Sequence, residues 1–305
     1  MKLLRNRISR LLLLPWWLLK QGFQYGGAAV IEGVMMRGPS NLALAVRQPN
    51  GNIALEKEEV LPLTSKHPWF KLPLIRGTFV MIDSLVIGMK ALSRSANLAM
   101  DEEEEELSLV EIAITIVLAT LLAVLLFIVV PTGAVHALRT SVAGVFLQNV
   151  VEGIIRIAVF LAYVWAISRM EDIDRVFMYH GAEHKAIHTY EHGEDLTVDN
   201  AQKYPTFHPR CGTSFLVVVM VISIFVFALL GDGSLAWKIG SRILVLPVVA
   251  GLGYEFIKLT TRYSDTGWGQ MLIAPGQWLQ GMTTREPDDS QMEVALKALR
   301  EVLAS

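Results

Sequence analysis

Long apolar runs dominate the middle of the chain. The two cleanest contain no charged side chain and approach the roughly 20 apolar residues that carry a helix across a bilayer. In one of two weaker runs, Glu152 and Arg156 stand four residues apart, so they share a helix face and can pair. The clean runs are residues 112–130 and 213–230, and the weaker ones are residues 141–167 and 237–257. The pattern predicts about four transmembrane helices, the weaker two partly shielded from lipid by the others.

Other periodicities flank these runs. Residues 28–36 form one apolar stretch that suits a strand, and residues 42–47 and 53–60 flank the hairpin turn Pro49-Asn50-Gly51-Asn52. Residues 74–100 carry apolar residues at helical spacing, broken by charges, which predicts an amphipathic helix along the membrane or the bundle. A last helix should begin near Asp288 or Asp289, just after Pro287, and run to about Val302.

The pattern predicts a mainly α membrane protein, with a small N-terminal β-hairpin or sheet and a cytoplasmic histidine-bearing helical loop as its α+β extramembrane part. At the N-terminus, Pro15, Trp16 and Trp17 interrupt an apolar run, which favours an interfacial anchor over a cleaved signal peptide. The expected organisation is an anchor (1–22), a β subdomain (23–65), an amphipathic helix (70–100), an acidic linker (101–106), transmembrane helices 1 and 2 (107–168), a cytoplasmic metal-site loop (169–212), transmembrane helices 3 and 4 (213–259), and a cytoplasmic tail with a C-terminal helix (260–305).

Composition agrees with a membrane protein. Of the 305 residues, 52% are hydrophobic and 18% charged, which excludes intrinsic disorder for most of the length. The net charge of −2 gives no sign of a nucleic-acid partner, and the single cysteine excludes an intramolecular disulfide. Lys and Arg near the predicted spans number nine on the side of the middle loop and three on the other. We therefore expect a multi-pass protein of the inner or plasma membrane, with both termini cytoplasmic.

The middle loop carries the most distinctive chemistry. Histidines recur every four residues from His180 through His184 and His188 to His192. Each step of four advances about 6 Å along a helix, so one ion can bind two neighbours but not the whole row. His180, Glu183 and His184 form the pattern H-x-x-E-H, in which two histidines hold zinc and the glutamate acts on the water beside it. The sequence therefore predicts a site for a divalent metal, and the H-x-x-E-H pattern favours zinc. Glu183 is the expected general base.

A zinc site needs a third protein ligand. The turn His208-Pro209-Arg210-Cys211, directly before an apolar run, can supply His208 or Cys211, and we favour His208. Cys211 has the alternative of being a small core residue. Glu191 lies about 10 Å along the axis from His184, so we expect it to support the site or to bind a second ion near His188. Arg210 is expected to play a supporting or substrate-binding role.

Three stretches of the chain resemble the YqhQ-like bacterial membrane proteins, a family of unknown function with predicted metal-dependent activity. They are residues 26–39, residues 179–191 continuing through 208–215, and residues 283–287. The resemblance implies a metal-dependent enzyme at the histidine helix, without supplying a reaction, and draws attention to Glu32 and Arg37. These two are site candidates, with a structural contact between Glu32 and Arg37 as the alternative. The family pattern does not include His188 or His192, which suggests a lesser role for both.

Two functions remain open from the sequence. One is a zinc-dependent hydrolase at the cytoplasmic membrane face, acting on a peptide or a lipid-linked molecule. The other is a non-enzymatic membrane scaffold or partner-binding protein, in which a metal or a histidine–carboxylate network holds the middle loop together. The lipid bilayer is the one partner that both interpretations require.

Overall fold

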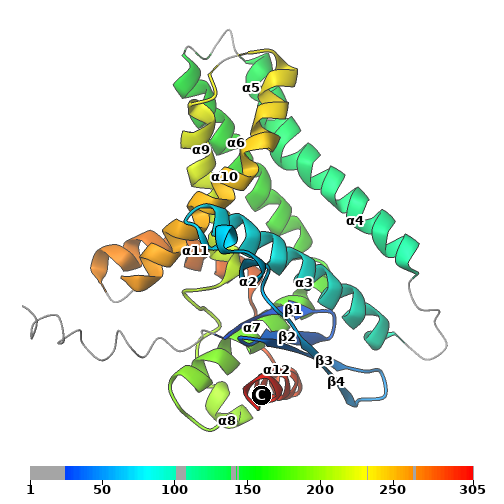
Figure 1. Ribbon diagram of the computed structural model, residues 1–305. Coiled ribbons are helices and arrows are strands. Elements are labelled where there is room, and N and C mark those ends of the chain that lie inside the picture. Colours follow the sequence, from blue (N-terminus) through cyan, green and yellow to red (C-terminus); the bar gives the residue numbers. More distant parts are fainter. Residues whose placement is uncertain are drawn as a thin grey trace, which may run out of the picture.

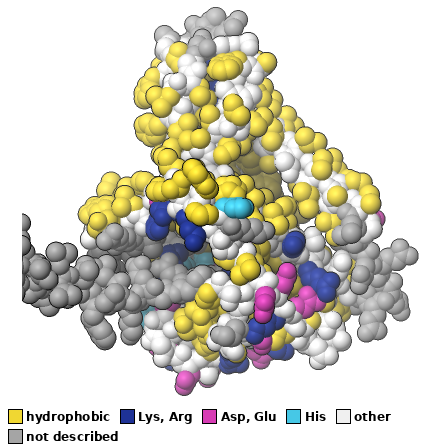
Figure 2. All heavy atoms as spheres, in the orientation of Figure 1, with side chains coloured by type: hydrophobic (Ala, Val, Ile, Leu, Met, Phe, Trp, Pro, Cys, Tyr) yellow, Lys and Arg dark blue, Asp and Glu magenta, His cyan; other side chains and the backbone are white. Residues whose placement is uncertain are grey.

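The computed structural model has two parts, a helical bundle and a layer built around a small sheet (Figure 1). It describes residues 25–100, 108–138, 142, 144–231, 233–263 and 266–304. The predicted anchor (1–22) and acidic linker (101–106) lie outside the described residues. Hydrophobic side chains cover the bundle, whereas charged side chains gather on the sheet layer (Figure 2). The distribution fits a bundle surrounded by lipid and a sheet layer in water.

The sheet is antiparallel, in the order β1-β2-β3-β4. Its strands are β1 (Gly26–Val30), β2 (Gly33–Arg37), β3 (Asn41–Arg47) and β4 (Ile53–Glu59). The prediction of one strand over residues 28–36 was wrong, because the chain turns between Val30 and Gly33, which are paired residues of β1 and β2. Glu32 makes this turn with a positive φ of 49°, a conformation uncommon outside glycine. The predicted hairpin around residues 49–52 is confirmed between β3 and β4.

Both faces of the sheet are covered, which explains why its side chains alternate between two cores. One core joins alternate strand residues such as Val34 and Met36 to helices α7 (Glu171–Glu191) and α12 (Asp289–Leu303). The other core joins Met35 and its neighbours to α3 (Ile75–Ala99). The predicted C-terminal helix is confirmed as α12, whose Met292, Leu296 and Leu299 are almost wholly buried.

Apolar helices form the bundle. Among the residues that the structure describes, three stretches are long and apolar enough to cross a membrane: Val110–Ala137, Val145–Ile167 and Leu235–Thr260. A fourth helix, α9 (Gly212–Ala228), is apolar but shorter. The structure thus has several candidate membrane spans. The remaining bounds are α2 (Leu63–Lys66), η2 (Pro68–Lys71), α4 (Leu109–Val124), η3 (Leu125–Val129), α5 (Val130–Ala137), α6 (Val145–Ile167), α8 (Val198–Ala201), α10 (Leu235–Arg262) and α11 (Gly267–Thr283).

Proline changes the helical pattern in the first candidate span. The stretch η3 is π-helical and is followed at once by Pro131 in α5. Proline has no N–H to give to the carbonyl four residues earlier, which is that of Phe127. Nε of Arg156 donates to this carbonyl oxygen at 2.8 Å. A guanidinium from α6 therefore stabilises the irregular part of the neighbouring helix.

The charges inside the bundle form a larger cluster than the sequence indicated. Arg156 pairs with Glu152 at 2.7 Å, as the spacing of four predicted. Arg242 of α10 also binds Glu152, with Nε and Nη2 each 2.6 Å from a carboxylate oxygen. The three side chains are all buried, and Thr132 donates to Glu152 as well. Glu152 is thus shared by two arginines, and the cluster ties α10 to α6 through charge-assisted hydrogen bonds.

Helix α11 was not foreseen. The segment after residue 260 was expected to be a tail preceding the C-terminal helix, but Gly267–Thr283 is helical and packs across α9. The hydroxyl of Thr266 caps it by accepting from the N–H of Gly269. Gly276 permits the close crossing, because a Cβ there would come within 2.5 Å of Ser214 on α9. This helix brings further side chains to the histidines of α7.

Candidate metal centre

Helix α7 supplies the predicted site. It begins with Glu171, Asp172 and Asp174 in its first turn, where acidic side chains favour the positive end of the helix dipole. Its middle is packed between the sheet, α12 and the loop before α9, and His184 is only 1% exposed. The histidine row therefore lies largely inside the protein rather than on a solvated helix.

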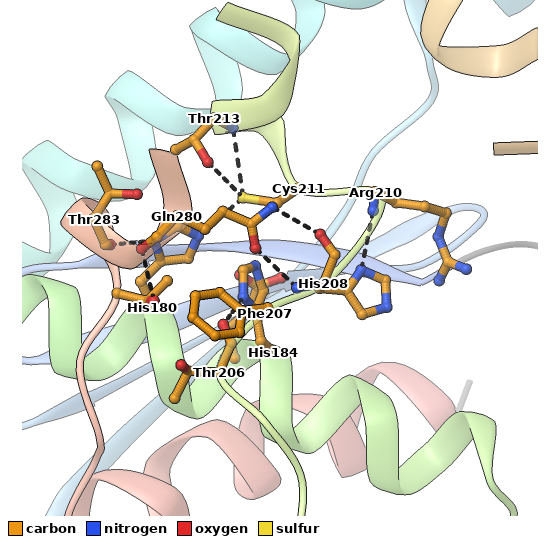
Figure 3. A network of polar contacts seen from close by, with 12 residues as sticks. His180, His184, Thr206, Phe207, His208, Arg210, Cys211, Thr213, Gln280 and Thr283 are labelled. Atoms are coloured by element: carbon orange, nitrogen blue, oxygen red, sulfur yellow. Dashed lines mark hydrogen bonds and ion pairs between the residues drawn. The ribbon is translucent and has the colours of Figure 1, made fainter. Parts of the chain in front are cut away.

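His180 and His184 have the same hydrogen-bond arrangement (Figure 3). Nδ1 of His180 lies 2.8 Å from the carbonyl oxygen of Thr283, and Nδ1 of His184 lies 2.5 Å from that of Thr206. A carbonyl only accepts, so in the neutral form of each ring Nδ1 carries the proton and Nε2 keeps its lone pair. Histidines that bind metals are oriented in this way, with the distant nitrogen held by a backbone carbonyl or carboxylate.

Cys211 completes a group of three donors. Its Sγ lies 3.2 Å from Nε2 of His180, and one ligand atom from each of His180, His184 and Cys211 falls within 4.8 Å of the others. Donors around one tetrahedral zinc stand about 3.3–3.6 Å apart when bond lengths are near 2.0–2.3 Å. The group is therefore close to the size that zinc requires, and two imidazoles with one thiolate are ligands that zinc favours.

Glu183 lies beside this group in a buried position. Its carboxylate oxygen is 3.8 Å from Nε2 of His184, and the side chain is almost wholly enclosed. Burial raises the pKa of Glu183, whereas His180, His208 and the backbone N–H of Gly27 favour its charged form. A buried carboxyl group with a raised pKa next to two histidines is a candidate for proton transfer.

A second group of possible ligands adjoins the first. His188, Glu191 and His208 also offer donor atoms within 4.8 Å of one another. Nε2 of His208 lies 3.3 Å from Glu191, and Arg210 forms an ion pair with the same carboxylate. Burial opposes the ionisation of Glu191, but the hydrogen bonds from His208 and Arg210 outweigh it and lower its pKa to about 2. Burial also lowers the pKa values of His188 and His208, which favours their neutral forms.

The two residues predicted as a third ligand, Cys211 and His208, lie in different groups. Cys211 lies with His180 and His184, whereas His208 lies with Glu191 and His188, its ring centroid 5.7 Å from that of His184. The sequence favoured His208, and the geometry favours Cys211. Glu191 lies near His188, where the sequence allowed a second ion. Nδ1 of His192 lies 2.8 Å from the carbonyl oxygen of His188 one turn earlier, and the side chain is exposed.

Several contacts of the site were missed by sequence reasoning. The side chain of Gln280 in α11 accepts from the backbone N–H of His208 at 2.8 Å and donates to its carbonyl at 2.9 Å. The hydroxyl of Thr213 lies 3.2 Å from Sγ of Cys211. Gln280 is fully buried. The one feature of the sequence that could have indicated its role is a glutamine within a weakly polar segment that contains no charged residue.

Glu32 and Arg37 do not pair with each other. Glu32 binds Arg175 of α7 at 2.6 and 2.5 Å and accepts from Tyr179 at 3.3 Å. Arg37 pairs with Asp83 of α3 at 2.6 Å. The predicted alternative of a mutual contact was wrong because Glu32 lies in the turn and faces α7. Glu32 thus fixes the part of α7 directly before His180, and Arg37 joins the sheet to α3.

The three stretches that suggested a family converge on α7. The N–H of Gly27 in β1 contacts Glu183, and the carbonyl of Thr283 accepts from His180. The N–H of Arg285 donates to the carbonyl of Phe177 at 2.9 Å. These contacts join the N-terminal sheet and the segment after α11 to the histidine helix.

Comparison with known proteins agrees with this convergence. The profile of a family described as "Protein of unknown function (DUF1385)" matches residues 72–305. The "Uncharacterized protein YqhQ" of Bacillus subtilis (strain 168) is 34% identical over 297 residues, which cover 92% of this chain and 92% of the relative. No solved structure matches the chain. The chain therefore belongs to the DUF1385 family of proteins of unknown function, and it is similar to YqhQ along nearly its whole length.

Proposed function

We propose that this protein is a membrane-bound, metal-dependent hydrolase that holds zinc between His180, His184 and Cys211. The observation that carries the proposal is the orientation of the two histidines. Both Nδ1 atoms are held by backbone carbonyls, which leaves both Nε2 atoms for a metal beside the cysteine sulfur. His208 is the alternative third ligand.

The roles of the side chains follow from their positions. Zinc, when bound, would lower the pKa of a water ligand to about 7. Glu183 lies close enough to Nε2 of His184 to accept a proton from a water molecule there and to return it to a leaving group. Arg210 and Glu191, at the more exposed side of the site, are placed to orient a polar substrate.

The proposed topology has four spans, with α9 as the third, in the inner or plasma membrane. Two of the three cations first counted on the far side, Lys238 and Arg242, are buried in the bundle. Lys238 donates to Gln148, and Arg242 binds Glu152, so both serve the bundle rather than a loop. Of those three, only Arg139 remains for the positive-inside comparison, which supports a cytoplasmic site and cytoplasmic termini.

One observation favours the alternative of a non-enzymatic scaffold. His180 and His184 each bind the backbone of a different segment, at Thr283 and Thr206, so they join α7 to its neighbours even without a reaction. Lys185 contributes in the same way, because it pairs with Glu286 at 2.8 Å rather than with Glu183. The scaffold needs the histidines but has no use for the proton affinity of Glu183.

The substitution Glu183→Gln separates the two functions. It keeps the size of the side chain and both imidazoles, so the purified variant should retain its metal. A general base contributes about 10²–10⁴-fold to a rate, so the variant should fail to restore the phenotype of a strain lacking the gene. Glu171→Gln, the same change at an exposed position of α7, is the matched control and should restore the phenotype fully.

Full restoration by a metal-replete Glu183→Gln protein would contradict the hydrolase and leave the scaffold standing. Metal content is measured by mass spectrometry on the full chain purified in detergent. The comparison with Glu171→Gln excludes an effect of lost charge on the folding of α7.

A further inference from the structure

Helix α11 has large apolar side chains that are exposed on its surface. Its sequence, Gly267–Thr283, contains no charged residue. Trp268, Met271, Leu272 and Trp278 are exposed by 49, 77, 40 and 62%. At 100° per residue Trp268, Met271 and Trp278 fall within an arc of about 80° on one face of the helix, and Leu272 lies about 40° beyond that arc, past the buried Leu279. The opposite face packs on α9.

The tryptophans indicate what covers this face. Each tryptophan that the structure describes is about half exposed or more. Trp165 lies at the end of α6 that leads into α7, close to the sheet layer. Trp237 lies in the first turn of α10, at the other end of the bundle. Tryptophan collects at the two headgroup levels of a bilayer, because its ring is apolar and its N–H seeks a polar partner. Trp165 therefore marks one membrane boundary, at the end of the bundle where α11 begins directly after α10.

A second helix has the same placement. Both α3 and α11 run across the junction between the bundle and the sheet layer (Figure 1). On α3, Ile82, Leu85 and Leu92 are 42–55% exposed, although the helix packs against α10 and the sheet. Two crosswise helices with apolar outer faces at one level are typical of proteins that insert helices into the headgroup region.

The buried side of α11 contacts the candidate metal centre. Gln280 holds both backbone groups of His208, and the carbonyl of Thr283 holds Nδ1 of His180. Between this helix and the loop before α9 lies a hollow of about 690 Å³, lined by Pro209, Gln270 and Gln277 among others. Pro209 is two residues from Cys211, so the hollow lies next to the site along the chain.

We propose that α11 lies in the headgroup region of the bilayer and that the hollow beside Pro209 receives an amphiphile from the membrane. The polar part of the amphiphile would reach toward the centre, and its apolar part would stay in lipid. The position of α11 is independent of the metal. The choice of a lipid-borne substrate over a soluble peptide rests on the proposed hydrolase.

The depth of α11 can be measured without altering Cys211. A fluorescent non-natural amino acid replaces Met271, and the full chain is placed in bilayers containing lipids brominated on their acyl chains. The same probe at Leu118, which is exposed on candidate span α4, is the lipid control, and the probe at Asp195, in an exposed loop, is the water control. We expect quenching at position 271 to exceed that at 195 by about fivefold and to approach that at 118.

Quenching at 271 equal to that at 195 would overturn the membrane position of α11.

The hollow is tested separately, by measuring the binding of a fluorescent lysophospholipid. The variant Ala274→Trp fills the hollow, and Ala166→Trp, at an exposed position of α6, is the matched control. Ala274→Trp should weaken binding about tenfold, which corresponds to about 1.4 kcal/mol, and leave metal content unchanged. Equal binding by both variants would exclude the hollow as the lipid site. If position 271 is quenched but the purified protein contains no metal, the headgroup position of α11 stands and the proposed hydrolase is rejected.

Discussion

At the scale of single residues, Gly181 decides how closely α7 approaches the segment after α11. A Cβ at this position would collide with the carbonyl oxygen of Arg285 and come within 3.1 Å of Thr206. Both neighbours belong to segments that hold the candidate ligands, since Thr206 binds His184 and Arg285 follows Thr283 closely. The absence of a side chain at Gly181 is thus a requirement of the site as well as of packing.

Gly181→Ala should therefore disturb both stability and metal binding. Overpacking of this kind costs about 1–3 kcal/mol, and the segments that hold Nδ1 of His180 and His184 would have to shift. Gly88→Ala is the matched control, because a Cβ at Gly88 in α3 meets nothing within 4 Å. Thermal unfolding in detergent and metal content provide the measurements. A Gly181→Ala protein that matches Gly88→Ala in both would show that α7 and the Arg285 segment are not packed as described.

The local spacing of residues was predictable, whereas their distant partners were not. His180, Glu183 and His184 share one helix, so their relation follows from helical geometry alone. The contact of Gly27 with Glu183 joins residues far apart in the sequence, and nothing in the residue types near Gly27 indicates it. The choice between Cys211 and His208 likewise depends on how one turn is oriented, which the sequence leaves open.

At the scale of elements, Asp288 determines where α12 begins. Its carboxylate accepts from the N–H of Gln291 at 2.8 Å, and the Gln291 side chain returns a bond to the N–H of Asp288 at 3.0 Å. Burial opposes the ionisation of Asp288, but the backbone N–H of Gln291, together with the hydroxyl and backbone N–H of Ser290, keeps its pKa below the usual value. The cap positions the helix that covers one face of the sheet beside α7.

Asp288→Ala should destabilise α12 by about 0.5–2 kcal/mol, and Asp288→Asn by much less. Because the folded pKa is lowered, the carboxylate stabilises the protein above the unfolded pKa of about 3.9, and this contribution is lost as the pH falls through the folded value. Hydrogen exchange of the α12 amides measures both effects. Equal exchange in Asp288→Ala and the unsubstituted chain above pH 5 would contradict the capping role.

Helices α12 and α11 show which elements a sequence reveals. Pro287, Asp288 and an apolar stripe mark α12 locally, so its bounds could be predicted. Helix α11 contains Pro275 and several glycines, which argue against a helix, and it forms because Gly276 and its neighbours pack on α9. The β1–β2 turn was missed for a related reason. Glu32 takes a positive φ that is stabilised by its pairing with Arg175, not by its own preference.

At the scale of the whole molecule, the sequence predicts the classes of its parts better than their assembly. The apolar runs and the N-terminal strands follow from composition and period. The cluster around Glu152 shows the limit. Arg156 was visible four residues away, but Arg242 comes from another helix and could not be assigned from spacing. The candidate centre has the same character, because α7, α11, β1 and the loop before α9 all contribute to it.

The central claim is that His180, His184 and Cys211 hold one metal ion, and X-ray absorption at the zinc edge of the full chain tests it most directly. We predict a shell of one sulfur at about 2.3 Å together with nitrogen or oxygen ligands at about 2.0–2.1 Å. The sulfur shell should vanish in Cys211→Ser and persist in His192→Ala. A bound metal without a sulfur ligand, or a purified full chain that binds no metal, would contradict the account.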